Sequence, residues 1–391
     1  MGLGFLATLN MHLLLFSYSP LINGIRLEMG LSNAQAGLLF SVCILTLMVL
    51  RVPWGMFCDR KGFRVTTGLA LTLMGFFGLL RGFAMDYGMF LASQFLLGAA
   101  LSAIIPCLPK LVSAWFPKQK SGLATGVCMA GFPVGDVLGL SVTPYLSTLL
   151  GNWRQVFQLY GAWSLLLVVL WWKFAHENFE KTPEQTAYEY RSLRQDFAIL
   201  FRTKEIWLLT GLYFCAAGCY DTALVWLAEI LRSKGISPFM AATVGSMLPL
   251  GFFAASISVG TFSDRLGSRK PFVLILGLLS GPVIYLTGTI FGPALYVAAF
   301  LVGFCTVGVL TLTLAIPIEL PKLSSHLSSA LGLISSLGNA SSFLLPIVVG
   351  QIKDATGAFS LAIFMLAVMG ECMFALGLAL RETGRKGGGN A

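Results

Sequence analysis

The stretch Leu50–Arg64 reads LRVPWGMFCDRKGFR, and a near-copy of its last ten residues, GTFSDRLGSR, returns at Gly260–Arg269. Both copies keep glycine, phenylalanine, aspartate, arginine, glycine and arginine in register. Each copy lies between two long apolar runs. A repeat at this separation indicates two structurally related halves.

The composition is that of a membrane protein. Of the 391 residues, 56% are hydrophobic and only 11% are charged, with a mean hydropathy of +0.81. A soluble chain of this length would need more charge to cover its surface. Apolar runs long enough to cross about 30 Å of hydrocarbon occur throughout. We therefore predict an all-α integral membrane protein with twelve transmembrane helices, at 3–22, 34–57, 65–84, 89–114, 122–149, 156–174, 206–231, 238–262, 272–291, 294–318, 327–352 and 359–380.

The segment 176–205 is polar and divides the chain. We predict an N-terminal six-helix bundle at 1–175, a cytoplasmic central loop at 176–205 with an amphipathic helix near 188–201, and a C-terminal six-helix bundle at 206–391. Two parallel repeats of six helices are typical of carriers that work by alternating access, with the substrate site near the midplane between the repeats.

The net charge of +9 follows from topology and does not indicate a nucleic-acid partner. Most of the 26 lysines and arginines fall in loops on one side of the predicted spans. Cytoplasmic loops carry such an excess of basic residues. We therefore expect both termini in the cytoplasm and the chain in the inner or plasma membrane. Arg81 is assigned to an outer loop by the same count.

The pattern G-x-x-x-D-R-x-G-x-R between the second and third spans of each half resembles the signature loop of the major facilitator superfamily. The resemblance implies a secondary carrier with a rocker-switch mechanism. It also implies a cytoplasmic latch, in which the loop aspartate faces the positive end of a neighbouring helix. A simple basic anchor for the cytoplasmic side is the alternative. The gating role carries to Gly55, Asp59, Arg60, Gly62 and Arg64, and to Gly260, Asp264, Arg265, Gly267 and Arg269.

Arg51 stands eight residues before Asp59, which places it about 12 Å deeper along a helix. An unpaired arginine at that depth costs at least roughly 2.5–3.5 kcal/mol, so it should face water or a partner. A guanidinium binds an oxygen-rich anion through two donors. Arg51 is therefore a candidate substrate contact. The alternative is a structural pair with Asp136, Asp221 or Glu371.

The sequence around Arg51 resembles the second span of the nitrate/nitrite porters, and the wider first half resembles the related cyanate porters. Nitrate porters have a second arginine at the equivalent position of the eighth span, where this chain has Ser256. The single arginine favours another small anion, such as cyanate, nitrite or a monocarboxylate.

Three interior ionisable residues, His12, Asp136 and Asp221, are candidates for carrying a coupling proton. His12, Asp221, Ser256 and Tyr220 join Arg51 as candidate substrate contacts. For each, a hydrogen-bonded interior group is the alternative. Lys110 is either a guide for an anion or a basic anchor.

These features predict a monomeric, lipid-embedded secondary transporter of a small anion with a proton as coupling ion. We expect no cofactor, no metal site, no nucleic-acid partner and no catalytic residue. The alternative function is a proton-coupled exporter of hydrophobic drugs or metabolites on the same fold. A channel is a second alternative, from a different class of membrane protein. The chain has no Gly-Lys dipeptide, which excludes a phosphate-binding loop of the ATPase type.

Overall fold

A computed structural model describes residues 1–115, 121–176, 201–320 and 327–383. Within these ranges the chain is helical and contains no strand, which confirms the all-α prediction. Eleven segments of the described chain are long and apolar enough to cross a membrane. The predicted helix near 188–201 and most of the central loop lie outside the described residues.

Eleven segments rather than twelve are found because α3, Asn33–Gly82, contains two of the predicted spans. The chain changes direction at Gly62, where φ is 82° and ψ is 162°. Glycine alone adopts this backbone conformation without strain. The equivalent glycine of the second motif, Gly267, also has a positive φ, of 63°. The twelve-span prediction is therefore confirmed.

Several spans consist of two consecutive helices, although each is one uninterrupted apolar run in the sequence prediction. The first span breaks near Pro20, which lacks the amide that an α-helix needs there. The divided spans are α1 Gly2–Phe16 with η1 Ser19–Leu21 and α2 Ile22–Met29, α4 Tyr87–Leu101 with α5 Ile104–Trp115, α6 Ser121–Met129 with α7 Gly131–Leu150, α11 Pro238–Gly245 with α12 Met247–Leu266, and α15 Leu327–Gly338 with α16 Ala340–Thr356. The continuous helices are α8 Trp153–Phe174, α10 Lys204–Ser233, α13 Lys270–Thr289, α14 Ala294–Glu319 and α17 Ser360–Ala379.

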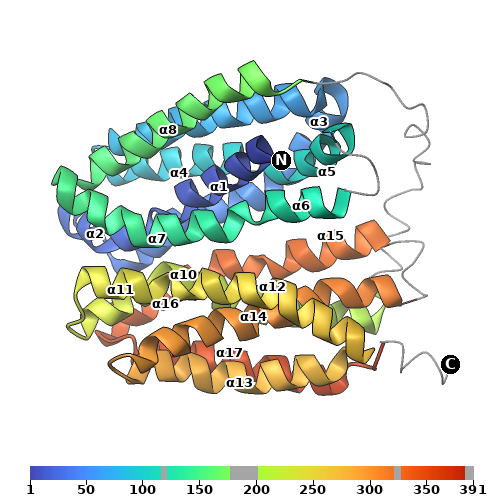
Figure 1. The fold of residues 1–391 in the computed structure, drawn as a ribbon. Helices are drawn as coiled ribbons and strands as arrows, with labels where there is room; N and C mark the ends of the chain where they lie inside the picture. Colours follow the sequence, from blue (N-terminus) through green and yellow to red (C-terminus); the bar gives the residue numbers. More distant parts are fainter. Residues whose placement is uncertain (116–120, 177–200, 321–326, 384–391) are drawn as a thin grey trace. The chain divides into compact units, whose positions relative to one another are not determined.

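The described chain forms two compact units. The first holds the described part of Met1–Asn178 together with Thr222–Leu250 and Phe343–Ala362. In it, α3 packs against α4, α5 and α8, and α1 packs against α7 (Figure 1). The second holds the described part of Phe179–Asp221 with Gly251–Ser342 and Ile363–Ala391. The division into two six-helix halves at 176–205 stays a prediction.

Glycines on α7 bring α1 and α7 close together. Gly131, Gly135 and Gly139 all face α1, and a Cβ on Gly135 would overlap the Leu9 carbonyl oxygen and lie 2.9 Å from Cβ of His12. Small residues at this spacing allow helix backbones to approach. The same device joins α13 to α17 in the second unit. There, a Cβ on Gly281 would overlap the Glu371 carboxylate, so Glu371 lies in the seam between these two helices.

The assignment of Arg81 to an outer loop is wrong. Arg81 lies in the last turn of α3 and is 0% exposed. Its Nη1 donates to the Leu14 carbonyl at 3.0 Å and to Oε1 of Gln94 at 3.3 Å. The Phe157 ring lies 4.2 Å from its guanidinium carbon. Hydropathy alone places a charge at a span end in water, but a carbonyl, an amide and an aromatic face together keep this arginine inside.

Candidate functional site

His12 and Asp136 form a hydrogen-bonded pair in the interior of the first unit. Nδ1 of His12, on α1, lies 2.7 Å from Oδ1 of Asp136, on α7. The glycines beside Asp136 bring the two helices close enough for this contact. Both residues were proton-coupling candidates, and the structure brings them together.

The two members of this pair differ in exposure. The side chain of Asp136 is 3% exposed, whereas that of His12 is 19% exposed. The His12 ring stacks on Phe132, with ring centroids 4.4 Å apart. A carboxylate this deeply buried needs a hydrogen-bonded partner to stay charged. Histidine is thus the more exposed member of the pair.

Arg51 lies half-buried on α3, in a segment that is held by a contact to α4. Its pairing with Asp136, Asp221 or Glu371, or with a substrate, stays a prediction. One turn away from Arg51, Nε1 of Trp54 donates to the Ala99 carbonyl at 2.8 Å and fixes α3 to α4 at this level. Helix packing thus holds the segment that carries the guanidinium.

The other candidate substrate contacts lie in the second unit. Asp221 is half-buried on α10, and the neighbouring Tyr220 ring packs against Phe252 at 5.6 Å between centroids. Ser256 is exposed on α12, and its hydroxyl donates to the Phe253 carbonyl of its own helix at 3.0 Å. A serine hydroxyl held this way leaves its lone pairs available as acceptors.

The first motif loop is held by contacts to α5 and α8. Asp59 forms an ion pair with Lys110 at 2.6 Å, and Lys110 also approaches the Cys58 carbonyl at 3.4 Å. Arg64 donates from Nη2 to the Trp172 carbonyl at 3.3 Å, close to the end of α8. A cation at a helix C-terminus is stabilised by the helix dipole. Arg60 is exposed.

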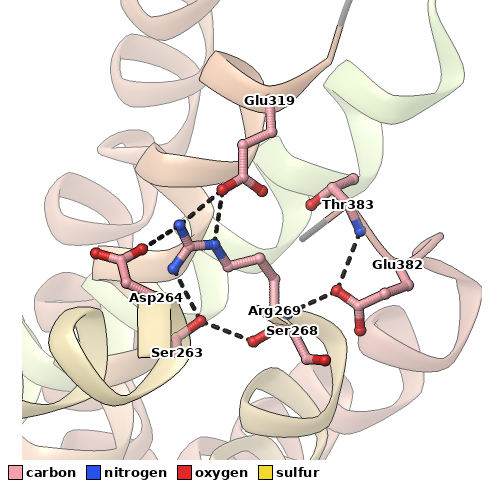
Figure 2. Close-up of polar contacts among 7 residues, drawn as sticks. All are labelled: Ser263, Asp264, Ser268, Arg269, Glu319, Glu382 and Thr383. Carbon is pink, nitrogen blue, oxygen red and sulfur yellow. Dashed lines mark hydrogen bonds and ion pairs between the residues drawn. The ribbon is translucent and has the colours of Figure 1, made fainter. Parts of the chain in front are cut away.

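The second motif loop is built differently, around the buried side chain of Arg269 (Figure 2). Its Nε and Nη2 donate to Oε1 of Glu319 at 3.0 and 2.7 Å, and Nη2 also donates to Oδ1 of Asp264 at 2.5 Å. Its Nη1 donates to Oγ of Ser263 at 2.9 Å. The carboxylate of Glu319, followed by that of Asp264, raises the pKa of Arg269, against the opposing effect of burial. Arg265 is exposed.

A second carboxylate, Glu382, holds the start of α13. Its Oε1 accepts from the Arg269 amide at 2.6 Å (Figure 2). Its Oε2 accepts from the Lys270 amide at 3.2 Å. These are amides of a helix N-terminus, which have no acceptor within the helix. Sequence reasoning missed Glu319 and Glu382. The sequence does contain a signal for them. Glu319 and Glu382 each lie just after the predicted end of a span, on the cytoplasmic side of the predicted topology, where Arg269 also lies.

Comparison with known proteins fits this architecture. The family model described as Major Facilitator Superfamily matches residues 4–346 and 209–390. The chain belongs to the major facilitator superfamily. The resemblance of the two motif loops to the signature of this family is thus confirmed. Relatives and fold neighbours of the chain are transporters of the superfamily, not enzymes.

The curated relatives include two Bacillus subtilis (strain 168) proteins. One, named "Probable galactarate/D-glucarate transporter GudP", is 25% identical over 374 residues, which cover 86% of this chain and 81% of the relative. The other, named "Nitrite extrusion protein", is 24% identical over 367 residues, which cover 92% of this chain and 88% of the relative. The second agrees with the predicted resemblance to the nitrate/nitrite branch of the superfamily.

Solved structures show the same fold. A crystal structure of a variant of the nucleoside transporter NupG superposes with a TM-score of 0.79, at 14% sequence identity. The superposition covers 96% of this chain and 98% of that chain. At this identity the likeness concerns the major facilitator fold alone.

Proposed function

We propose that this major facilitator protein moves a small oxygen-rich anion, such as nitrite, cyanate or a short carboxylate, with a proton as the coupling ion. The observation that supports the proton part is the His12–Asp136 pair, in which a buried carboxylate lies within hydrogen-bond distance of a partly exposed histidine. Uptake or release of one proton changes the charge of this pair without exposing the carboxylate.

The anion class rests on Arg51 and on the relatives. Arg51 is a half-buried residue on α3. A guanidinium has two parallel donors that match the geometry of a carboxylate or nitrite. The relatives named above are described as transporters of sugar diacids and of nitrite, which are oxyanions. Ser256 in place of a second arginine leaves the recognition asymmetric.

In the proposed cycle, the protein transports its substrate by a rocker-switch movement of its two halves. The two motif loops regulate this movement. Asp59 with Lys110, and Arg269 with Asp264 and Glu319, are the contacts that hold the loop ends of their helices. We place these loops and both termini in the cytoplasm of the cell membrane, as the distribution of basic residues indicates.

Ligand-induced thermal stabilisation of the purified protein tests this proposal. The panel contains nitrite, cyanate, lactate, tartrate, galactarate and a lipophilic cation. A ligand that binds only the folded state raises the melting temperature as its concentration exceeds Kd. We expect a shift with at least one of the anions, lost in Arg51→Leu and retained in Arg60→Leu, which removes an exposed arginine of the motif loop.

The alternative, a proton-coupled exporter of hydrophobic compounds, makes the opposite prediction. It gives a shift with the lipophilic cation alone, unchanged in Arg51→Leu. That result would remove the anion proposal and leave Arg51 as a structural residue.

A further inference from the structure

Asp354, near the end of α16, caps the beginning of α3 across 321 residues of sequence. Its Oδ1 accepts from the backbone amide of Asn33 at 2.9 Å and from Nδ2 of Asn33 at 2.7 Å. Its Oδ2 accepts from the Ala34 amide at 2.8 Å. All three residues belong to the first unit. One exposed carboxylate thus receives three hydrogen bonds from the first turn of another helix.

Helix α3 already has its own capping box. Oγ of Ser32 accepts from the Gln35 amide at 3.1 Å, and Oε1 of Gln35 accepts from the Ser32 amide at 2.9 Å. The capping box thus provides acceptors for the amides of Ser32 and Gln35. Asp354 serves the amides of Asn33 and Ala34, which water would otherwise solvate at this exposed end. Its main effect is therefore to fasten α16 to α3.

The helices meet backbone to backbone just beneath this contact. A Cβ on Gly350 of α16 would overlap the Asn33 carbonyl oxygen, and a Cβ on Gly37 of α3 would overlap the Pro346 carbonyl oxygen. One glycine on each helix thus removes the side chain that would hold the partner away. The same Pro346 carbonyl accepts from Nε1 of Trp226 at 3.0 Å, which adds α10 to the junction.

A separate contact joins the first span to α10 in this unit. The hydroxyl of Ser19, in η1, lies 2.6 Å from the Leu224 carbonyl and 2.8 Å from the Val225 carbonyl. The three hydrogen bonds of Asp354 described above all go to Asn33 and Ala34, not to η1 or α10. Within the first unit, the helices from early in the chain thus contact those from later in the chain at two separate places. One is Asp354 with the start of α3, and the other is Ser19 with α10.

We propose that Asp354 is the releasable clasp of this junction: it holds α16 on the start of α3, and the junction opens and closes during transport. The inference rests on the proposed transport cycle, in which the two halves move against each other. A carboxylate is suited to this role because two of its three partners are backbone amides at a positive helix end. Since Asp354 is exposed, water replaces these partners when the clasp opens.

Hydrogen–deuterium exchange of the purified full-length chain tests the clasp without any substrate. In Asp354→Asn, which removes the charge and one acceptor oxygen, we expect faster exchange at residues 33–40, by roughly two- to tenfold for each hydrogen bond of ordinary net strength. If the whole junction opens, exchange should also become faster at 17–22 and 222–226, which lie outside the hydrogen bonds of Asp354 described above. Faster exchange confined to residues 33–35 would mean that Asp354 is only a helix cap, and no change at all would equally overturn the proposal.

Three further variants accompany this one. Asp86→Asn removes a carboxylate whose Oδ1 accepts from the Met89 amide of its own helix at 2.8 Å, so faster exchange should stay within the first turn of α4. Gly350→Ala forces the backbones apart without changing any charge, and should reproduce the widespread effect of Asp354→Asn. Gly24→Ala, where an added Cβ has nothing within 4 Å, should not.

The outcome separates the clasp from the substrate proposal. Exchange is measured without ligand, so a failed anion panel leaves the result intact. Conversely, unchanged exchange in Asp354→Asn together with an anion shift that depends on Arg51 would reject the clasp and keep the anion proposal.

Discussion

Nδ1 of His12 lies 2.7 Å from Oδ1 of Asp136, and the carboxylate of this pair is almost fully buried while the imidazole is partly exposed. The two residues come from the first and fifth predicted spans, 124 positions apart. The contact depends on the glycine face of α7, because a larger residue at Gly135 would hold α1 away.

The first prediction concerns the charge of this pair. Asp136→Asn keeps the shape but removes the charge-assisted hydrogen bond, which is worth about 1.5–3 kcal/mol. We expect uptake driven by a proton gradient to fall on the order of tenfold or more, while exchange of substrate across the membrane without net proton movement persists. Uptake into vesicles with and without an imposed pH gradient measures both. His176→Gln, at an exposed histidine whose Nδ1 lies 3.0 Å from the Phe174 carbonyl, is the control. Equal loss of driven uptake and exchange would argue against a proton role.

The second prediction concerns the helix contact that makes the pair possible. Gly135→Ala places a methyl group against the Leu9 carbonyl and His12, and overpacking of this kind costs about 1–3 kcal/mol. Gly126→Ala, in α6, meets nothing within 4 Å and should be neutral or slightly stabilising, since alanine favours helix. Melting temperatures of the two variants should therefore move apart. If Gly126→Ala destabilises as much as Gly135→Ala, close packing is not the reason for the glycine.

Much of this architecture could be predicted from the sequence. Apolar runs and the two motif copies suffice for the twelve spans, because both signals are local: length and hydropathy for the spans, and a fixed pattern for the loops. The motif requires glycine at Gly62 and Gly267 because both residues have a positive φ at the turn, where other residues would be strained.

The pairing of side chains could not be predicted in the same way. His12 and Asp136 were both candidates, but which interior acid meets which base depends on the rotation of each helix about its axis. Hydropathy does not fix this rotation when a helix is apolar on all sides. Arg81 was misplaced for a related reason, because its partners are a carbonyl, an amide and a ring that carry no charge signal in the sequence.

The third prediction concerns Arg81. Arg81→Met keeps an apolar stem but removes the donor to Oε1 of Gln94 and one of the two side-chain donors to the Leu14 carbonyl, at a cost of about 1–3 kcal/mol. The loss should appear in denaturant unfolding in detergent micelles. Arg60→Met, at an exposed position, should stay within about 0.5 kcal/mol of the parent. An Arg81→Met protein as stable as the parent would show that the buried guanidinium contributes nothing net, as can happen when a buried charge is replaced by a well-packed apolar group.

The last prediction ranks the two acids that share Arg269. The Glu319 side chain is 26% exposed and receives two of its hydrogen bonds, whereas the Asp264 side chain is 65% exposed and receives one. Exposed ion pairs contribute about 0.2–1 kcal/mol because water and salt screen them, and hydrogen bonds to charged groups with less solvent contribute about 1.5–3 kcal/mol. In double-mutant cycles with Arg269→Gln, the coupling of Glu319→Gln should therefore exceed that of Asp264→Asn, and only the Asp264 coupling should vanish at high salt. Equal couplings would mean that Glu319 is not the main anchor of this arginine, and that the aspartate of the motif carries the loop by itself.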